Sequence, residues 1–222
     1  MNKIEIKNLF KRRELLDKTE MKDLLKRRES LLKEYKKLVD GYQNENNSEE
    51  LNNIFRESAN DVNYIICKID DKLFKWVKKS HVGNWLLEIK GVTPDLAAGL
   101  LAHFNIKNKD CAAQFISYSG ADSYTSHHNT DVKNIMNRLT SNFITNPGSL
   151  YGKLYKDKCT ELKSSNDMNA ITATIRADRY MRKVFISHLF EEMYREYHNG
   201  KLPERYNDDN RIIIEPEVPY TK

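Results

Sequence analysis

Residues 85–104, WLLEIKGVTPDLAAGLLAHF, carry the clearest structural pattern in this chain. Apolar residues recur at helical spacing on both sides of a Gly-x-Thr-Pro turn. Gly91 tolerates the positive φ of a tight reversal, Thr93 suits the N-cap, and Pro94 suits the first position of a helix. We predict two helices joined by a short hairpin. The residues expected to pack inside this unit are Leu86, Ile89, Val92, Leu96, Ala97, Leu100 and Leu101.

A helix-hairpin-helix of this kind indicates contact with nucleic acid. Such units hold the phosphate backbone through backbone amides and a helix N-terminus, without reading the bases. The predicted contacts are the amides of Gly91, Val92 and Thr93, with Lys90 beside them. A plain corner between two helices would carry the same turn, so a purely structural role is the alternative.

The N-terminal third predicts a long helical hairpin. Leucines and a tyrosine recur at coiled-coil spacing through residues 11–39, a polar turn follows at 40–48, and a second helix is expected over 49–79. The two helices either pair with each other or each pair with a second subunit, and we expect a homo-oligomer through this coiled coil. The expected stripe of the second helix is Leu51, Ile54, Val62, Ile65, Ile69, Leu73 and Trp76.

The rest of the chain also reads as helical. A break is expected at residues 80–83, and further helices are expected at 111–118, 131–144, 150–162 and 170–199. We therefore predict an all-α protein. Its expected parts are a coiled-coil hairpin at 1–80, a compact helical domain built on the helix-hairpin-helix at 81–200, and an irregular tail at 201–222.

Composition excludes several classes of protein. The net charge of +5 does not by itself establish a nucleic-acid partner, and the three cysteines form no C-x-x-C pair that would suggest a zinc site or a disulfide scaffold. No apolar run has the length of a membrane span, and the N-terminus lacks the apolar core of a signal peptide. We expect a cytoplasmic protein that binds no membrane, metal or cofactor.

A basic stripe on the last long helix is the second candidate for nucleic-acid contact. Its members recur every three or four residues and could follow a row of phosphates. The alternative is an ordinary solvated face, paired in part with Asp178, Glu191 and Glu192. The stripe consists of Arg176, Arg179, Arg182 and Lys183.

The loop at residues 117–130 is rich in hydroxyl groups and contains His127 and His128. Neighbouring histidines point in different directions, and no carboxylate stands at helical ligand spacing, so we predict no metal site here. A serine nucleophile would need an activating base and groups that stabilise charge. Hydroxyl-rich loops are usually only loops.

Three segments in this order resemble a known family. They are W-x-x-x-I-x-G-V-x-P-x-x-A-A-x-L-L at 85–101, F-x-S-Y-x-G at 115–120, and A-x-R-x-x-R-K-x-F at 177–185. Together with the coiled coil, they resemble the C-terminal transposase domain of the bridge-RNA-guided insertion-sequence transposases. The chain is also similar to stand-alone phage or mobile-element proteins that keep this half. The resemblance covers residues 15–198 and implies a helical domain that binds DNA.

The chain departs from this family at the positions that carry catalysis. Nothing corresponds to the family's RuvC-like domain with its four metal-binding acids. Thr93 stands where the family has glycine, and Ala121 replaces the leucine of its Y-x-G-L segment. The family's serine nucleophile lies in a Ser-Gly motif that is missing here, and Ser126 is the nearest candidate by position.

The leading prediction is therefore a non-catalytic protein that binds the backbone of nucleic acid, with DNA as the expected ligand, without strong sequence preference. Two alternatives remain. One is serine recombinase-like strand transfer, in which Ser126 attacks a phosphodiester. The other is a phage or mobile-element protein that binds a host protein through its coiled coil.

Overall fold

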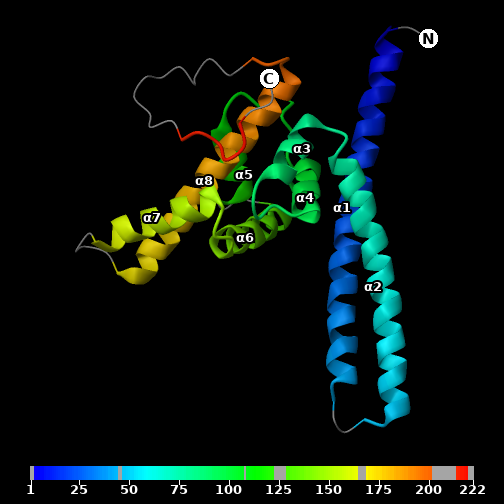
Figure 1. Cartoon of the computed structure of the whole chain (residues 1–222). Coiled ribbons are helices and arrows are strands. Elements are labelled where there is room, and N and C mark those ends of the chain that lie inside the picture. The colour runs from blue at the N-terminus through cyan, green and yellow to red at the C-terminus, as the bar shows by residue number, and fades with distance from the viewer. Residues whose placement is uncertain are drawn as a thin grey trace. The chain divides into compact units, whose positions relative to one another are not determined.

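The computed structural model describes residues 3–44, 47–107, 109–122, 129–164, 169–201 and 214–219, with side chains from Asp17 onward. These residues form helices and no strand, so the all-α prediction is confirmed (Figure 1). The chain divides into two units, Met1–Val77 and Lys78–Lys222. The helices are α1 (Lys3–Tyr42), α2 (Glu49–Val77), α3 (His81–Glu88), α4 (Pro94–His103), α5 (Ala112–Ser119), α6 (Thr130–Thr145), α7 (Leu150–Ser164) and α8 (Ala170–Tyr197).

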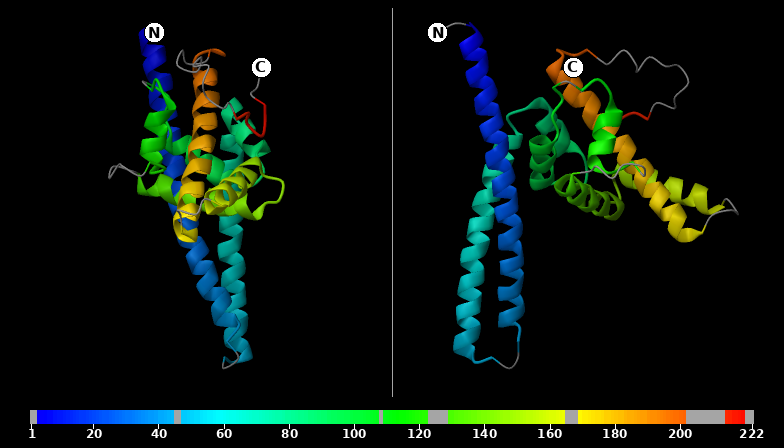
Figure 2. Two further views of the ribbon diagram at one scale, coloured as in Figure 1. Left: turned by 90° about the vertical axis from the view of Figure 1, so that its left-hand side faces the viewer. Right: turned by 180° about the vertical axis from the view of Figure 1, so that it is seen from behind.

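In the first unit, α1 and α2 lie side by side as an antiparallel hairpin (Figures 1 and 2). The Arg28 guanidinium of α1 reaches the Asp70 carboxylate of α2, with 3.1 Å between Nη2 and Oδ2. The two predicted helices therefore pair with each other within one chain. The buried residues of α2 recur every three or four positions, as a helical seam requires. They are Ala59, Val62, Ile66, Ile69, Leu73 and Val77.

The seam of α2 differs from the predicted stripe. Ile65, which was expected inside, is 45% exposed, whereas its neighbour Ile66 is 4% exposed. Leu51 and Ile54 are also exposed. Successive residues lie 100° apart around a helix, so both isoleucines fit a three-four spacing and only the position of α1 decides between them. The prediction was also wrong about α1, which begins at Lys3 rather than at residue 11.

In the second unit, α4 is the central core helix. Every residue from Asp95 to Ala102 is buried, which is typical of a helix surrounded by other elements. Close packing requires its small residues, because a Cβ on Gly99 would lie 2.7 Å from Cδ1 of Ile135 in α6. The quoted stretch therefore forms the core of this unit, as its apolar pattern predicted, and Leu86, Ile89 and Val92 are buried beside it.

Helix α8 runs along two clusters of aromatic side chains. Phe190 contacts Phe115 of α5 edge-on, with 5.3 Å between ring centroids. Phe185 contacts Phe143 of α6 at 5.3 Å and Tyr151 of α7 at 5.1 Å. All five rings are buried. Aromatic burial on this scale is a large part of what holds α5, α6 and α7 against α8.

The predicted break at residues 80–83 was wrong, because α3 begins at His81. Ser80 is the N-cap of α3, and its Oγ accepts a hydrogen bond from the Gly83 amide at 2.9 Å. The Glu196 carboxylate of α8 accepts hydrogen bonds from the amides of His81 and Val82. These acceptors satisfy the first amides of the helix, so it starts immediately after Ser80. Within the described ranges, no helix is both long enough and apolar enough to cross a membrane.

Candidate nucleic-acid interface

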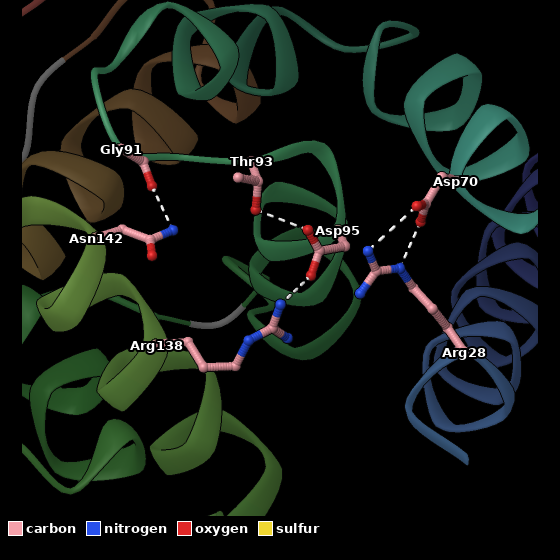
Figure 3. A network of polar contacts seen from close by, with 7 residues as sticks. All are labelled: Arg28, Asp70, Gly91, Thr93, Asp95, Arg138 and Asn142. Atoms are coloured by element: carbon pink, nitrogen blue, oxygen red, sulfur yellow. Dashed lines mark hydrogen bonds and ion pairs between the residues drawn. The ribbon is translucent and has the colours of Figure 1, made fainter. Parts of the chain in front are cut away.

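The turn between α3 and α4, residues 89–93, is packed against the end of α6. Gly91 has a φ of 99°, the left-handed conformation that its sequence position predicted. Its carbonyl accepts a hydrogen bond from Nδ2 of Asn142 in α6 at 3.0 Å (Figure 3). A Cβ on Gly91 would lie 3.0 Å from Cδ1 of Phe143, so the backbone can approach α6 only without a side chain here.

The predicted amide donors of this turn differ in availability. The Val92 amide donates to the Ile89 carbonyl at 3.1 Å and is therefore occupied. The Lys90 amide donates to the Glu217 carboxylate at 3.2 Å. The amides of Gly91 and Thr93 donate to no other residue in the part of the chain that the structure describes. Two of the three predicted amide contacts, Gly91 and Thr93, can therefore still meet an anion.

The N-terminus of α4 already faces a carboxylate. Thr93 occupies the N-cap position, but its side chain caps no backbone amide and instead donates to Oδ1 of Asp95 at 2.7 Å. The other oxygen of Asp95 forms an ion pair with Arg138 of α6 (Figure 3). A carboxylate in the first turn offsets the positive end of the helix dipole. This end of α4 attracts a phosphate less than the sequence predicted.

The predicted basic stripe of α8 contains one residue with a structural role. Arg182 is only 12% exposed; its Nε forms an ion pair with Asp178 at 2.7 Å, and its Nη1 donates to Asn137 of α6 at 3.0 Å. Thr140 of α6 also donates to Asp178. Arg182 therefore ties α8 to α6 and does not face solvent as the other three residues do.

The other three basic residues, Arg176, Arg179 and Lys183, form one exposed face, which we call the α8 basic face. Their spacings of three and seven residues place them within about 60° of one another around the helix. Across the described ranges, none of them forms an ion pair. Glu191 and Glu192, which the sequence suggested as partners of the basic stripe, are buried and are not part of this exposed face.

A buried histidine joins the tail to the helical domain, which the sequence did not reveal. Nε2 of His188 lies 2.7 Å from the Ile214 carbonyl, and Nδ1 lies 2.9 Å from the Tyr151 hydroxyl. A carbonyl only accepts, so Nε2 carries the proton and Nδ1 accepts from Tyr151. Burial lowers the pKa of His188 and raises that of Tyr151, which favours this neutral pair.

The predicted serine nucleophile, Ser126, lies outside the described residues, as do His127 and His128. Ser119, at the start of the same loop, is buried; its Oγ donates to the Ile116 carbonyl at 2.7 Å and accepts from the Ala121 amide at 3.3 Å. This hydroxyl has a structural role. No group of three His, Cys, Asp or Glu side chains in the described ranges could hold a metal ion.

No protein-family model matches this chain, and searches of curated proteins and of solved structures also found no match. The resemblance to the transposase domain therefore stays a prediction.

Proposed function

We propose that this protein binds the phosphate backbone of nucleic acid, with the α8 basic face as the principal contact. The observation that carries this proposal is the exposure of Arg176, Arg179 and Lys183 on one face without a carboxylate partner among the described residues. Three neighbouring cations without internal partners are available to an external anion. A chain of phosphates fits them better than a single small anion does, because they are spread along the helix.

The spacing of this face suits one strand of a duplex. At a rise of about 1.5 Å per residue, Arg176 and Lys183 lie about 10 Å apart along the helix axis. Phosphates of one DNA strand recur about every 3.4 Å along the duplex axis, so the face can span roughly three of them. Contacts of this kind position a protein on the backbone without selecting a sequence.

The turn at residues 89–93 is proposed as a second contact, through the amides of Gly91 and Thr93. The Lys90 side chain supports it, because Nζ lies over Gly148, at 2.9 Å from the position of a Cβ there. The Lys90 ammonium therefore lies close to the turn that leads into α7. The resemblance to the transposase domain favours DNA as the ligand, and the missing Ser-Gly motif favours binding without catalysis.

The salt dependence of binding to duplex DNA of mixed sequence tests this proposal. Each phosphate contact contributes about −0.9 to the slope of log K against log salt concentration. Replacing Arg176, Arg179 and Lys183 together by alanine should make the slope less negative by about 2.7 and weaken binding to all sequences alike. The matched control is Arg27→Ala, which removes an exposed arginine from α1.

Two results would reject the proposal: no binding by the unchanged protein at low salt, or equal slopes for the triple variant and the control. Comparing Arg182→Ala with Arg179→Ala distinguishes a loss of stability from a loss of binding. Because Arg182 is paired with Asp178, its loss should lower the stability of the second unit, whereas Arg179→Ala should lower affinity and leave stability unchanged.

A second candidate function is self-association through the helical hairpin. Leu51, Ile54 and Ile65 are exposed and lie within about 60° of one another on α2. Exposed apolar residues that share one face of a helix can be covered by another chain. If a second copy covers it, replacing Ile54 and Ile65 together by aspartate should convert a dimer to a monomer in sedimentation. A monomeric unchanged protein would reject this role.

A further inference from the structure

Residues 214–219 lie across the second unit and contact four of its elements. The Ile214 carbonyl accepts from His188 of α8 at 2.7 Å, and the Val218 carbonyl accepts from Nε1 of Trp85 in α3 at 3.0 Å. Between these two contacts, the Glu217 carboxylate reaches the turn at residues 89–93 and the start of α7. Figure 1 shows this segment in red, running back over α8. We call residues 214–219 the strap.

Glu217 holds two backbone amides with its two oxygens. Oε1 accepts from the Lys90 amide at 3.2 Å, and Oε2 accepts from the Leu150 amide at 3.0 Å. Leu150 is the first residue of α7, so its amide has no acceptor within the helix. Phosphate oxygens form the same charge-assisted hydrogen bonds with backbone amides. Glu217 therefore places an internal anion on the Lys90 amide, directly before Gly91 in the chain, and this negative charge opposes a phosphate that approaches the turn.

The strap is held at the surface of the second unit. Its polar contacts are hydrogen bonds made by two carbonyls and one carboxylate, and none of its six residues is buried. If it leaves, water can accept from Trp85 and His188 in place of the two carbonyls.

We propose that the strap is autoinhibitory: Glu217 competes with a nucleic-acid phosphate for the turn at residues 89–93, and binding displaces the strap. This inference rests on the proposed function. The closed strap lowers the apparent affinity by the fraction of molecules in which the turn is covered. The α8 basic face is not covered by these contacts, so nucleic acid can meet it first and then displace the strap.

A comparison of Glu217→Gln with Glu215→Gln tests the strap in the full-length chain. Both variants remove one negative charge from the same segment, but Glu215 accepts no hydrogen bond from any described residue. A glutamine at 217 replaces one of the two oxygens by an NH2 group, which would face a backbone N–H and cannot accept from it. Glu217→Gln should bind duplex DNA roughly tenfold more tightly than Glu215→Gln, the factor expected if the strap is closed about 90% of the time.

Fluorescence of Trp85 reports the position of the strap directly. The chain has 2 tryptophans, so Trp76→Phe leaves Trp85 as the sole indole. Saturating DNA should shift its emission, because Nε1 then exchanges the Val218 carbonyl for water. In the full-length chain, Glu217→Ala removes both acceptor oxygens and should bind as tightly as Glu217→Gln, and it replaces that variant if the glutamine prevents folding.

The outcomes distinguish the two proposals. If the protein binds DNA but the two glutamine variants bind with equal affinity, the proposed autoinhibition is wrong and the proposed function is unaffected. An unchanged Trp85 emission at saturation would also overturn the strap. If no variant binds DNA at low salt, the proposed function is wrong, and so is the autoinhibition that rests on it.

Discussion

Arg138 of α6 forms an ion pair with Asp95 of α4, whose side chain is 6% exposed (Figure 3). The same carboxylate accepts a hydrogen bond from Thr93 at 2.7 Å. A buried carboxylate is tolerated only when it is paired and hydrogen-bonded, and both conditions are met here. The pair ties the core helix to α6 immediately beside the turn at residues 89–93. The position of this turn therefore depends on a charge that lies outside the quoted stretch.

Removing the cation of this pair should destabilise the second unit. Arg138→Ala leaves the Asp95 carboxylate buried without its charge partner, and we expect a loss of about 2 kcal/mol in the free energy of unfolding. Urea denaturation followed by circular dichroism measures it. The double variant with Asp95→Asn should recover part of the loss, because the remaining group is neutral. A single variant with an unchanged midpoint would contradict this account.

The stability of the second unit should fall at mildly acidic pH. Burial lowers the pKa of His188 below its ordinary 6.5. The unfolded chain therefore binds this proton at a higher pH than the folded chain does. The free energy of unfolding is then highest above pH 6.5 and falls as the pH drops below it, by at most about 1.4 kcal/mol per pH unit.

Denaturation curves from about pH 7.5 to about pH 5.5 test this dependence, since this range brackets the ordinary histidine pKa. His188→Gln should flatten the dependence. His81→Gln should not, because the His81 side chain is exposed. Identical pH profiles for the two variants would show that His188 is not the responsible group.

Gly152 in α7 should tolerate no side chain. A Cβ there would lie 2.8 Å from the Phe143 carbonyl carbon and even closer to the carbonyl oxygen, and a backbone cannot move aside cheaply. Gly152→Ala should therefore cost roughly 3 kcal/mol in stability. Gly148→Ala is the control, because the nearest atom there is the mobile end of Lys90. Equal midpoints in urea would indicate that α6 and α7 are not packed as described.

The register of the helical hairpin can be tested at two adjacent residues. Ile66→Ala removes a buried side chain from the seam and should cost about 3 kcal/mol in the stability of the first unit. Ile65→Ala changes an exposed position and should cost less than about 1 kcal/mol. Thermal unfolding followed at the helical signal distinguishes them. A larger loss of stability for Ile65→Ala would support the stripe predicted from the sequence, in which Ile65 faces α1.

The sequence by itself determined where most helices lie. The predicted starts at Leu150 and Ala170 are the observed starts of α7 and α8, and Pro94 begins α4. The reason is local: an apolar period, an N-cap such as Asn169 and a proline act over a few residues. Four of the eight buried residues of α4 also followed from the apolar spacing, namely Leu96, Ala97, Leu100 and Leu101.

Only the tertiary structure decided which of two similar residues faces a partner. Arg179 and Arg182 carry the same charge on the same helix, yet Asp178 and Asn137 hold only Arg182. The amide of Lys90 is held by Glu217, 127 residues away in the chain. No local pattern encodes such pairings, since they depend on how distant helices pack. The C-terminal tail, which was expected to be irregular, thus supplies the Glu217 carboxylate that accepts from an amide of the predicted hairpin.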